Sequence, residues 1–408
     1  MTTAARCMIL AAAAALLWGC GGGSGSLEPR PDPGAIQVTT VTTGPSLDPD
    51  GYSITVDAGS PQAIGASASV TVPALPAGDH TVELGGVAGN CAVTEENPRT
   101  VTVTAGATAQ TTFGVVCQPP TLRNEILFLS KRNTPAEEIW VMTPEGGNLR
   151  RLTTSFESEA GIAASPDGRR IAFARILYVC RGSGCEISRS AIWVMDADGA
   201  NQLQLSTGPG IKDAAPEWSP DGTRIVFESQ NGPFASELWI MNADGSDRTP
   251  LTFDGRGNGD PDWSPDGTRI AYECNRPDDG SSSDVCVINA NGTETRNLTD
   301  DPAGITDGAN PAWSPDGSKI AFDSREAGTR EIWVMDAAGS NPTRLTTHVF
   351  RAPPDQAPTW SPDGGRIAFH TTSARGDDEI VVMNADGTGL TALTTTPGND
   401  NFPEWSRQ

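Results

Sequence analysis

The stretch WSPDGTRIVF at 218–227 is repeated as WSPDGTRIAY at 263–272, WSPDGSKIAF at 313–322 and WSPDGGRIAF at 360–369, with a degenerate copy, ASPDGRRIAF, at 164–173. A second phrase, of the type Glu-Ile-Trp-Val-Met, keeps the same spacing and precedes a turn such as Asn-Ala-Asp-Gly and a short Leu-Thr segment. Its six copies begin at Glu138, Ala191, Glu237, Asp284, Glu331 and Glu379. The period of about 45 to 54 residues lies in the range of β-propeller blades.

Each repeat has the composition of four short antiparallel strands. Ile-Ala-Phe and Ile-Trp-Val-Met are apolar runs of strand length, bounded by Pro, Asp and Gly. In Ser-Pro-Asp-Gly, proline presets the first central φ of a turn and glycine takes the positive φ that follows. Ala-Asp-Gly and Ala-Asn-Gly contain the pairs favoured in tight hairpins. The strand entering Trp-Ser, the Ile-Ala-Phe strand, the Ile-Trp-Val-Met strand and the Leu-Thr segment therefore make one blade.

The two ends of the repeat region complement each other. Ile126–Ser130 (ILFLS) matches the Ile-Ala-Phe strand but has no Trp-Ser strand before it, whereas Phe402–Ser406 (FPEWS) ends just after its Trp-Ser. The last strand is expected to complete the first blade. The repeat region then contains six strands of each of the four types. The sequence therefore predicts an all-β protein with a six-bladed propeller over residues 122–408, whose joined ends leave only short protected edges.

The ordered set of Trp-Ser-Pro-Asp-Gly, Ile-Ala-Phe, Glu-Ile-Trp-Val-Met-Asn-Ala-Asp-Gly and Leu-Thr resembles the repeat of the TolB-type propeller family. The resemblance covers residues 122–408 and implies the fold and a binding mode. The family's periplasmic member pairs its propeller with an N-terminal α/β domain and works in an envelope complex. Nothing before residue 122 resembles that α/β domain, so the resemblance does not imply the cellular role.

The first residues predict a lipoprotein signal. Arg6 precedes an apolar run from Met8 to Leu17, which is too short for a stable membrane-spanning helix and typical of a secretory signal. Leu17-Trp18-Gly19-Cys20 resembles the bacterial lipobox, so residues 1–20 are interpreted as a signal peptide with Cys20 as the lipidated residue; a plain signal peptide cut elsewhere is the alternative. Residues 21–34 read as a flexible tether rich in Gly, Ser and Pro. No acidic residue follows Cys20 directly, and we expect an anchor in the outer membrane, on its periplasmic or surface face.

Residues 35–118 have a different composition, rich in Thr, Val, Ala and Gly, with one Arg and no Lys or Trp. Alternating apolar and polar runs predict six or seven strands and an immunoglobulin-like β-sandwich that acts as a spacer. The predicted strands are Gln37–Thr43, Tyr52–Asp57, Ser67–Val72, Thr81–Leu84, Thr100–Thr104 and Gln110–Val116.

The cysteines point to an oxidising compartment. Once Cys7 leaves with the signal and Cys20 takes lipid, six remain in local pairs: Cys91 with Cys117, Cys180 with Cys185 in a loop insertion of the second blade, and Cys274 with Cys286 on facing strands. Neighbouring ligands at zinc spacing are missing, so three disulfides are the favoured interpretation over a metal site.

Charge and motifs narrow the function. Asp and Glu outnumber Lys and Arg by 51 to 28, which makes nucleic acid an unfavourable partner and leaves basic peptides, cations or neutral glycans. The chain has three histidines and no G-x-S-x-G, H-E-x-x-H or phosphate-loop signature. His370 is interpreted as a packing or rim residue, and the position-locked tryptophans as packing between blades. We therefore expect no enzyme but a monomeric, lipid-anchored envelope protein that binds a protein or cell-wall partner. The alternative is a carboxylate- or metal-dependent glycan lyase or hydrolase at the channel.

The candidate binding residues are six acidic side chains, one ahead of each Trp position of the repeat. They are Glu159, Asp213, Asp260, Asp307, Asp355 and Asp400. If the Trp-Ser strand is innermost, as the resemblance implies, these carboxylates ring one mouth of the channel and attract a basic partner segment or a cation such as calcium. The structural alternative is that each carboxylate only bonds its own blade-to-blade turn.

Overall fold

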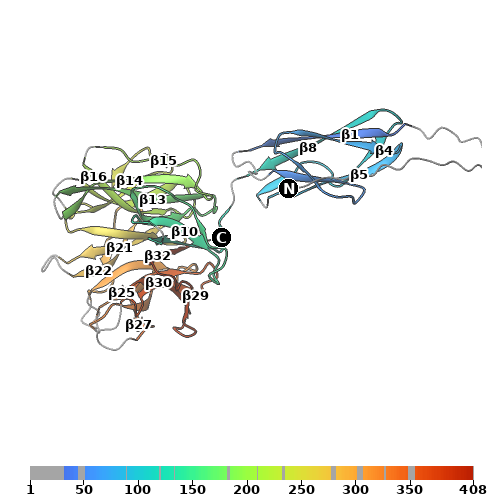
Figure 1. The fold of residues 1–408 in the computed structure, drawn as a ribbon. Helices are drawn as coiled ribbons and strands as arrows, with labels where there is room; N and C mark the ends of the chain where they lie inside the picture. The colour runs from blue at the N-terminus through green and yellow to red at the C-terminus, as the bar shows by residue number, and fades with distance from the viewer. Residues whose placement is uncertain are drawn as a thin grey trace, which may run out of the picture. The chain divides into compact units, whose positions relative to one another are not determined.

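The computed structural model describes residues 32–44, 51–88, 90–118, 121–132, 134–181, 184–208, 210–231, 235–276, 282–300, 307–325, 328–347 and 354–407, without the side chains of 179–181, 184–186 and 231. Every regular element among them is a β-strand (Figure 1). The chain divides into two compact units, and the boundary falls between Val116 and Cys117. The predicted signal, lipobox and most of the tether lie outside the described residues.

The first unit contains two four-stranded sheets. One has the order β4 (Ser69–Leu75), β1 (Gly34–Thr43), β8 (Thr108–Cys117), β6 (Cys91–Val93); the other has the order β3 (Gln62–Ile64), β2 (Tyr52–Val56), β5 (Gly78–Gly85), β7 (Arg99–Val103). β1 runs parallel to β8, and its side chains alternate between buried and more exposed, as expected for a strand with one face on a core. All six predicted strands are present, and β3 and β6 are short additions. The immunoglobulin-like class remains a prediction.

Among the described residues, the second unit contains four four-stranded antiparallel sheets and one eight-stranded sheet (Figure 1). The eight-stranded sheet consists of two four-stranded blades joined where Ser190 pairs in parallel with Lys212, so the unit has six blades. The inner strands are β12 (Ser158–Ala164), β16 (Ile211–Trp218), β20 (Asn258–Trp263), β24 (Gly308–Trp313), β28 (Asp355–Trp360) and β32 (Asp400–Trp405). The second strands are β13 (Arg170–Arg181), β17 (Arg224–Asn231), β21 (Arg269–Asn275), β25 (Lys319–Ser324), β29 (Arg366–Thr372) and β9 (Ile126–Ser130). The third are β14 (Gly184–Asp196), β18 (Glu237–Asn242), β22 (Ser283–Asn289), β26 (Glu331–Asp336), β30 (Asp378–Asn384) and β10 (Glu138–Met142). The outer strands are β15 (Leu203–Gln204), β19 (Thr249–Pro250), β23 (Arg296–Asn297), β27 (Thr343–Arg344), β31 (Thr391–Ala392) and β11 (Arg150–Arg151).

The ring closes through the last strand, as the sequence predicts. β32 pairs antiparallel with β9, with Trp405 opposite Ile126 and Asp400 opposite Ser130. Each inner strand also packs against the next one, and β32 packs against β12. One blade therefore combines three strands from the start of the repeat region with one strand from its end, and no inner strand is left without a neighbour.

The Ser-Pro-Asp-Gly segment forms the same turn in all five copies. In the copy at 219–222, the Ser219 hydroxyl donates to Asp221 Oδ1 at 2.6 Å, accepts from the Arg224 amide at 2.9 Å, and Gly222 has a φ of +69°. The hydrogen bond from Ser219 lowers the pKa of Asp221 to about 2. These aspartates therefore serve the turn, in agreement with the structural role expected for a residue found in every blade.

The apolar core lies between neighbouring blades. Trp218 of β16 packs in one cluster with Ala163 of the inner strand β12 and Ala172 of β13, and Trp263, Trp313, Trp360 and Trp405 occupy the equivalent place in their own clusters. Trp218, Trp263 and Trp405 are fully buried. The prediction that the tryptophans pack between blades is confirmed, and each deeply buried indole stabilises the ring through a large apolar area.

One predicted disulfide pairing is present among the described side chains, with a change in register. Cys274 and Cys286 are bonded with Cα atoms 5.9 Å apart, but Cys274 faces Asp284 and Cys286 faces Tyr272, so the bond joins diagonal rather than facing positions. Cys91 and Cys117 are both disulfide-bonded. Cys180 and Cys185 lie on a hairpin that extends β13 and β14 and are register partners, so this insertion is a β-ribbon and not a loop.

Candidate functional site

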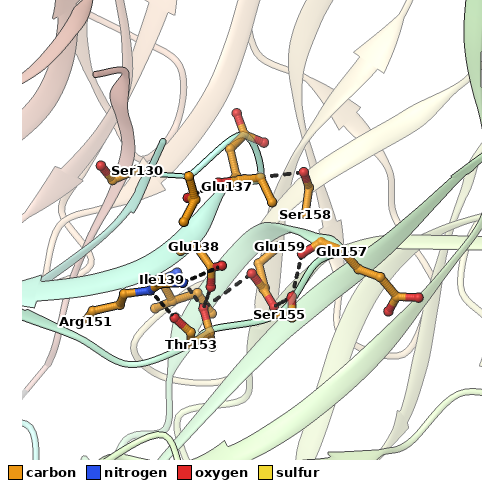
Figure 2. A network of polar contacts seen from close by, with 12 residues as sticks. Ser130, Glu137, Glu138, Ile139, Arg151, Thr153, Ser155, Glu157, Ser158 and Glu159 are labelled. Atoms are coloured by element: carbon orange, nitrogen blue, oxygen red, sulfur yellow. Dashed lines mark hydrogen bonds and ion pairs between the residues drawn. The ribbon is translucent and has the colours of Figure 1, made fainter. Parts of the chain in front are cut away.

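The Leu-Thr segment closes each blade through one hydroxyl group. In the first blade, Thr153 Oγ1 accepts a hydrogen bond from the Ile139 amide at 2.9 Å and donates to Glu138 Oε2 at 2.8 Å (Figure 2). The equivalent amide-to-hydroxyl bonds in the other five blades measure 2.8–3.0 Å. Their hydroxyls belong to Ser206, Thr252, Thr299, Thr346 and Thr394. The repeated hydroxyl therefore satisfies a buried amide in every blade, and in four blades it also donates to a Glu or Asp near the start of the third strand.

Glu159, the first predicted binding residue, belongs to this network. Its carboxylate accepts a hydrogen bond from Ser155 at 2.8 Å and lies 3.3 Å from Thr153 Oγ1 (Figure 2). It also accepts a hydrogen bond from Arg175 at 2.9 Å. The side chain is fully buried, and burial raises its pKa above the ordinary value, against the lowering effect of Ser155 and Arg175. Glu159 thus joins the outer end of one blade to the inner strand of the next.

Three more predicted residues occupy the same position, five residues before the Trp. Asp213 receives two hydrogen bonds from Arg248, at 2.9 and 2.7 Å, and Asp400 is paired with Arg132 and accepts from Ser130 at 2.5 Å. Asp355 is 1% exposed, and its amide donates to the Arg330 carbonyl at 2.9 Å. All four lie inside the inner strands rather than in the crossings before them, because the strands begin earlier than the repeat phrase suggests. Asp213 and Asp400 therefore pair with arginines outside their own blade-to-blade turns, and the role of these residues in binding stays a prediction.

Asp260 and Asp307 lie at other positions, three and six residues before their tryptophans, and Asn258 and Gly308 take the buried place in those strands. Asp307 Oδ1 is 3.7 Å from Arg330 Nη2, and Oδ2 is 3.8 Å from Arg325 Nε. Asp260 lines the central cavity. Of the six predicted binding residues, only Asp260 therefore lies where a ligand in this cavity could reach it.

Each inner strand contains a bulge that the sequence analysis missed. At the residue three before the Trp position, the backbone takes a positive φ in all six strands. These residues are Gly161 (+48°), Ala215 (+45°), Asp260 (+44°), Asn310 (+48°), Ala357 (+52°) and Phe402 (+48°). In five strands the next residue is proline, which has no amide to donate to the ladder, and the pairing register shifts there. The proline two residues before each of these Trp positions is the sequence feature from which the bulge could have been predicted.

The bulges line a cavity of about 460 Å³ at the centre of the ring. All six inner strands contribute to its wall, together with the prolines of the Ser-Pro-Asp-Gly turns. Acidic side chains of three inner strands line it as well: Glu217 of β16, Asp260 and Asp262 of β20, and Glu404 of β32. The cavity thus combines apolar proline and tryptophan walls with convergent carboxylates, which suits a ligand that carries both apolar and cationic groups.

One basic side chain enters this acidic wall. Arg407 Nη2 lies 2.5 Å from Asp262 Oδ1 and 3.1 Å from Glu217 Oε1. Burial raises the pKa of Glu404 to about 8, against the opposing effect of Arg407, and burial likewise raises the pKa of Glu217 and Asp262. Glu217 and Asp262 share the guanidinium of Arg407, and the negative charge of Asp262 raises the pKa of both Glu217 and Glu404 further.

A second acidic group consists of the bulge residue Asp260, Glu273 of β21 and Asp323 of β25. Burial, aided by Glu228, raises the pKa of Asp260 to about 7, and burial also raises the pKa of Glu273 to about 7. Asp323 is paired with Arg330 and accepts from the Ala357 amide at 3.2 Å. The Asp323 carboxylate thus accepts a hydrogen bond from a backbone amide that, because of the bulge, has no partner in the neighbouring strand.

His370 makes the same kind of cap in the next blade. Its Nδ1 accepts from the Phe402 amide at 3.3 Å, and its ring lies 5.1 Å from the Phe402 ring. Burial lowers the pKa of His370 to about 4, so the imidazole is neutral at pH 7 and can accept that hydrogen bond. The interpretation of His370 as a packing residue agrees with these contacts. His348 lies outside the described residues.

Within the described ranges, no group of three or more His, Cys, Asp and Glu is arranged to hold a metal ion. Nor does the part of the chain that the structure describes include a helix with the length and apolar character needed to cross a membrane.

Comparison with known proteins supports the family resemblance. Residues 174–354 match the model of the TolB beta propeller domain. A Tol-Pal system protein TolB of Novosphingobium aromaticivorans is 40% identical over 82 residues, a match that covers 20% of this chain and 16% of the relative.

Solved structures agree on the fold. TolB from Acinetobacter baumannii superposes with a TM-score of 0.58 at 20% identity, over 71% of this chain and 68% of that chain. A putative TolB from Agrobacterium tumefaciens gives a TM-score of 0.52 at 20% identity, over 69% of this chain and 92% of that one. Enzymes also occur among the similar structures. Residues 174–354 are thus similar to the TolB beta propeller domain, and the strand topology of the second unit agrees with that similarity.

Proposed function

We propose that this protein is a non-enzymatic binding protein of the cell envelope, whose propeller cavity receives a cationic segment of a protein partner. The observation that carries the proposal is the cavity itself, where four carboxylates and one guanidinium face a space of about 460 Å³ between proline and tryptophan walls. Clefts lined by one sign of charge concentrate ligands of the opposite sign, and low-dielectric walls strengthen this effect.

The shape and chemistry of the cavity favour a peptide segment over a metal ion or a neutral glycan. A cation such as calcium needs six to eight oxygen ligands converging on a point. Here the acidic groups are spread around a ring of strands, with Glu217 and Asp262 engaged by Arg407 and Asp260 set apart from them near Glu228. A chain of basic and apolar residues can contact such separated groups in succession, whereas a cell-wall glycan offers no charge complement.

The location follows from a second set of observations. Disulfides among the described cysteines and the relationship to TolB both suit the periplasm or envelope. We propose that Cys20 carries the lipid and that residues 21–34 are the tether. Replacing Cys20 by Ala is expected to move the protein from the membrane fraction to the soluble periplasm or medium. Unchanged partitioning into membranes would contradict the lipid anchor.

Crosslinking in intact cells tests the binding role. A photo-reactive amino acid placed at Ala312, which lines the cavity, is expected to capture one discrete partner protein identifiable by mass spectrometry. The matched control carries the same group at Ala338, an exposed residue in the turn after β26. Capture of the same proteins from both positions, or of none from Ala312, would contradict a partner that enters the cavity.

A further inference from the structure

Arg407 occupies a place that the other five repeats give to proline. The residue after each Trp-Ser or Ala-Ser is Pro166, Pro220, Pro265, Pro315 or Pro362, and all five line the rim of the cavity. In the sixth strand, Trp405-Ser406 is followed by Arg407. The one departure from the repeat therefore puts a guanidinium where the other blades place an apolar ring.

The carboxylates around Arg407 come from three different inner strands. Glu217, Asp262 and Glu404 all lie one residue before the Trp position, where the other three strands carry Ala163, Ala312 and Thr359. The Asp262 carboxylate is fixed from behind, since the Trp313 amide donates to its Oδ2 at 2.5 Å. A guanidinium presents five N–H donors in a planar fork, which suits carboxylates that approach from several sides.

The side chain of Arg407 is more exposed than the carboxylates that it contacts. The side chains of Glu217 and Asp262 are 9% and 11% exposed, whereas the Arg407 side chain is 34% exposed. The backbone before Arg407 is held, because the Ser406 amide donates to the Glu125 carbonyl and the Ser406 hydroxyl accepts from the Glu125 amide, both at 2.9 Å. The arginine side chain can therefore swing out to water while the carboxylates stay in place.

We propose that Glu217 and Asp262, with Glu404 nearby, form a guanidinium-binding site, which Arg407 fills from within the chain and which an arginine side chain of a partner enters when Arg407 leaves. The site opens into the same cavity, so the partner's neighbouring residues would lie along the proline and tryptophan walls. The entry of a partner arginine rests on the proposed function. The existence of the guanidinium site does not, because Arg407 already occupies it.

Chemical rescue of Arg407→Ala tests the site in the full chain. Removing the guanidinium leaves Glu217 and Asp262 without their ion-pair partner, so the melting temperature should fall. Ethylguanidinium should restore it and should bind about tenfold more tightly than ethylammonium, since a planar fork pairs with carboxylates better than a point charge. The wild type should show no such stabilisation at the same concentrations. Arg256→Ala is the matched control, because Arg256 is 51% exposed and lies 4.0 Å from Asp254 at the surface.

Two further variants keep the test decisive. If Arg407→Ala does not fold, the double variant Arg407→Ala/Glu404→Gln removes one of the clustered charges, and its binding of ethylguanidinium is measured by titration calorimetry. Adding Glu217→Gln and Asp262→Asn should abolish that binding. Equal stabilisation by ethylammonium, stabilisation of Arg256→Ala, or binding that survives loss of both carboxylates would overturn the site.

The result also separates this inference from the proposed function. Ethylguanidinium binding to Arg407→Ala without any partner captured at Ala312 would leave the site standing and remove the proposed function. A captured partner whose affinity is the same for wild type, Arg407→Ala and Glu217→Gln/Asp262→Asn would leave the function standing and overturn the entry of an arginine at this site.

Discussion

At the scale of single residues, burial and pairing decide which acidic side chains can meet a ligand. Asp213 and Asp400 each have a buried carboxylate in contact with an arginine, so both charges are already compensated within the blade. Breaking such a pair leaves an uncompensated buried charge, at a cost of about 3–5 kcal/mol. Asp260 and Glu404 instead face the cavity, and the raised pKa of each reports a carboxylate with too few compensating partners.

Glu404 makes the free energy of unfolding depend on pH in a defined direction. Its pKa is about 8 in the folded protein and 4.5 as the ordinary value, so between these limits the folded state holds a proton that the unfolded chain has lost. Stability should therefore fall as pH rises from about 5 to 8, by up to about 1.4 kcal/mol per pH unit. Glu404→Gln removes this contribution, and urea unfolding of both proteins at several pH values measures the difference.

The control for this experiment is internal. His370, whose pKa is lowered to about 4, makes stability rise with pH between about 4 and 6.5, but it is present in both proteins and cancels in the comparison. Parallel stability curves for wild type and Glu404→Gln across pH 5–8 would contradict the buried position of this carboxylate.

At the scale of strands and blades, the sequence repeat predicted which strands exist more accurately than where each strand begins and ends. The Ile-Ala-Phe and Ile-Trp-Val-Met strands lie where their apolar runs and β-propensity place them, because apolar runs of that length bury both faces between blades. The inner strands begin earlier than expected, since residues such as Asp355 and Asp400 are polar yet pair in the ladder. These residues can be buried because an arginine or a hydroxyl from another strand pairs with them. The polarity of a residue in the sequence does not reveal which distant residue will pair with it.

The Leu-Thr hydroxyl should be important for the stability of each blade. Thr394 Oγ1 accepts from the Ile380 amide at 2.9 Å and donates to Glu379 Oε2 at 2.8 Å, in a buried position. Thr394→Val keeps the shape but leaves both groups without this partner, so it should destabilise the protein by about 1–3 kcal/mol. Thr391→Val is the matched control, because Thr391 is exposed in β31. Equal urea midpoints for the two variants would argue against the role of this hydroxyl.

At the scale of the whole molecule, closure of the ring follows from sequence because strand counting is independent of contacts. The unmatched strands at 126–130 and 402–406 have no other partners of their type, and the structure pairs them. The cavity and its guanidinium site were not foreseen, because they arise where residues of six strands far apart in sequence converge. The sequence shows that Arg407 stands where the five other repeats have proline. Only the structure shows that this position lies in the cavity wall, next to acidic residues of other inner strands.

Removal of the closing strand should disrupt the entire propeller. Deleting residues 401–408 takes away the inner strand of the first blade, including Trp405, which is 1% exposed. Burial of one such side chain contributes roughly 1.5–3 kcal/mol, and the lost ladder with β9 adds to this. We expect a large fall in melting temperature, measured by calorimetry. A truncated protein that melts at the wild-type temperature would show that the closing strand contributes little.

The central claim is that the acidic cavity receives a cationic segment of a partner, and a charge placed inside it gives the most direct test. Ala312→Lys adds a cation to the cavity wall, whereas Ala338→Lys adds the same cation to an exposed turn. The measurement is the affinity of the protein captured at Ala312 for each variant, by titration calorimetry. We predict that Ala312→Lys weakens binding at least about tenfold, a loss of about 1.4 kcal/mol, and that Ala338→Lys binds like the wild type. Wild-type affinity in Ala312→Lys would contradict the account.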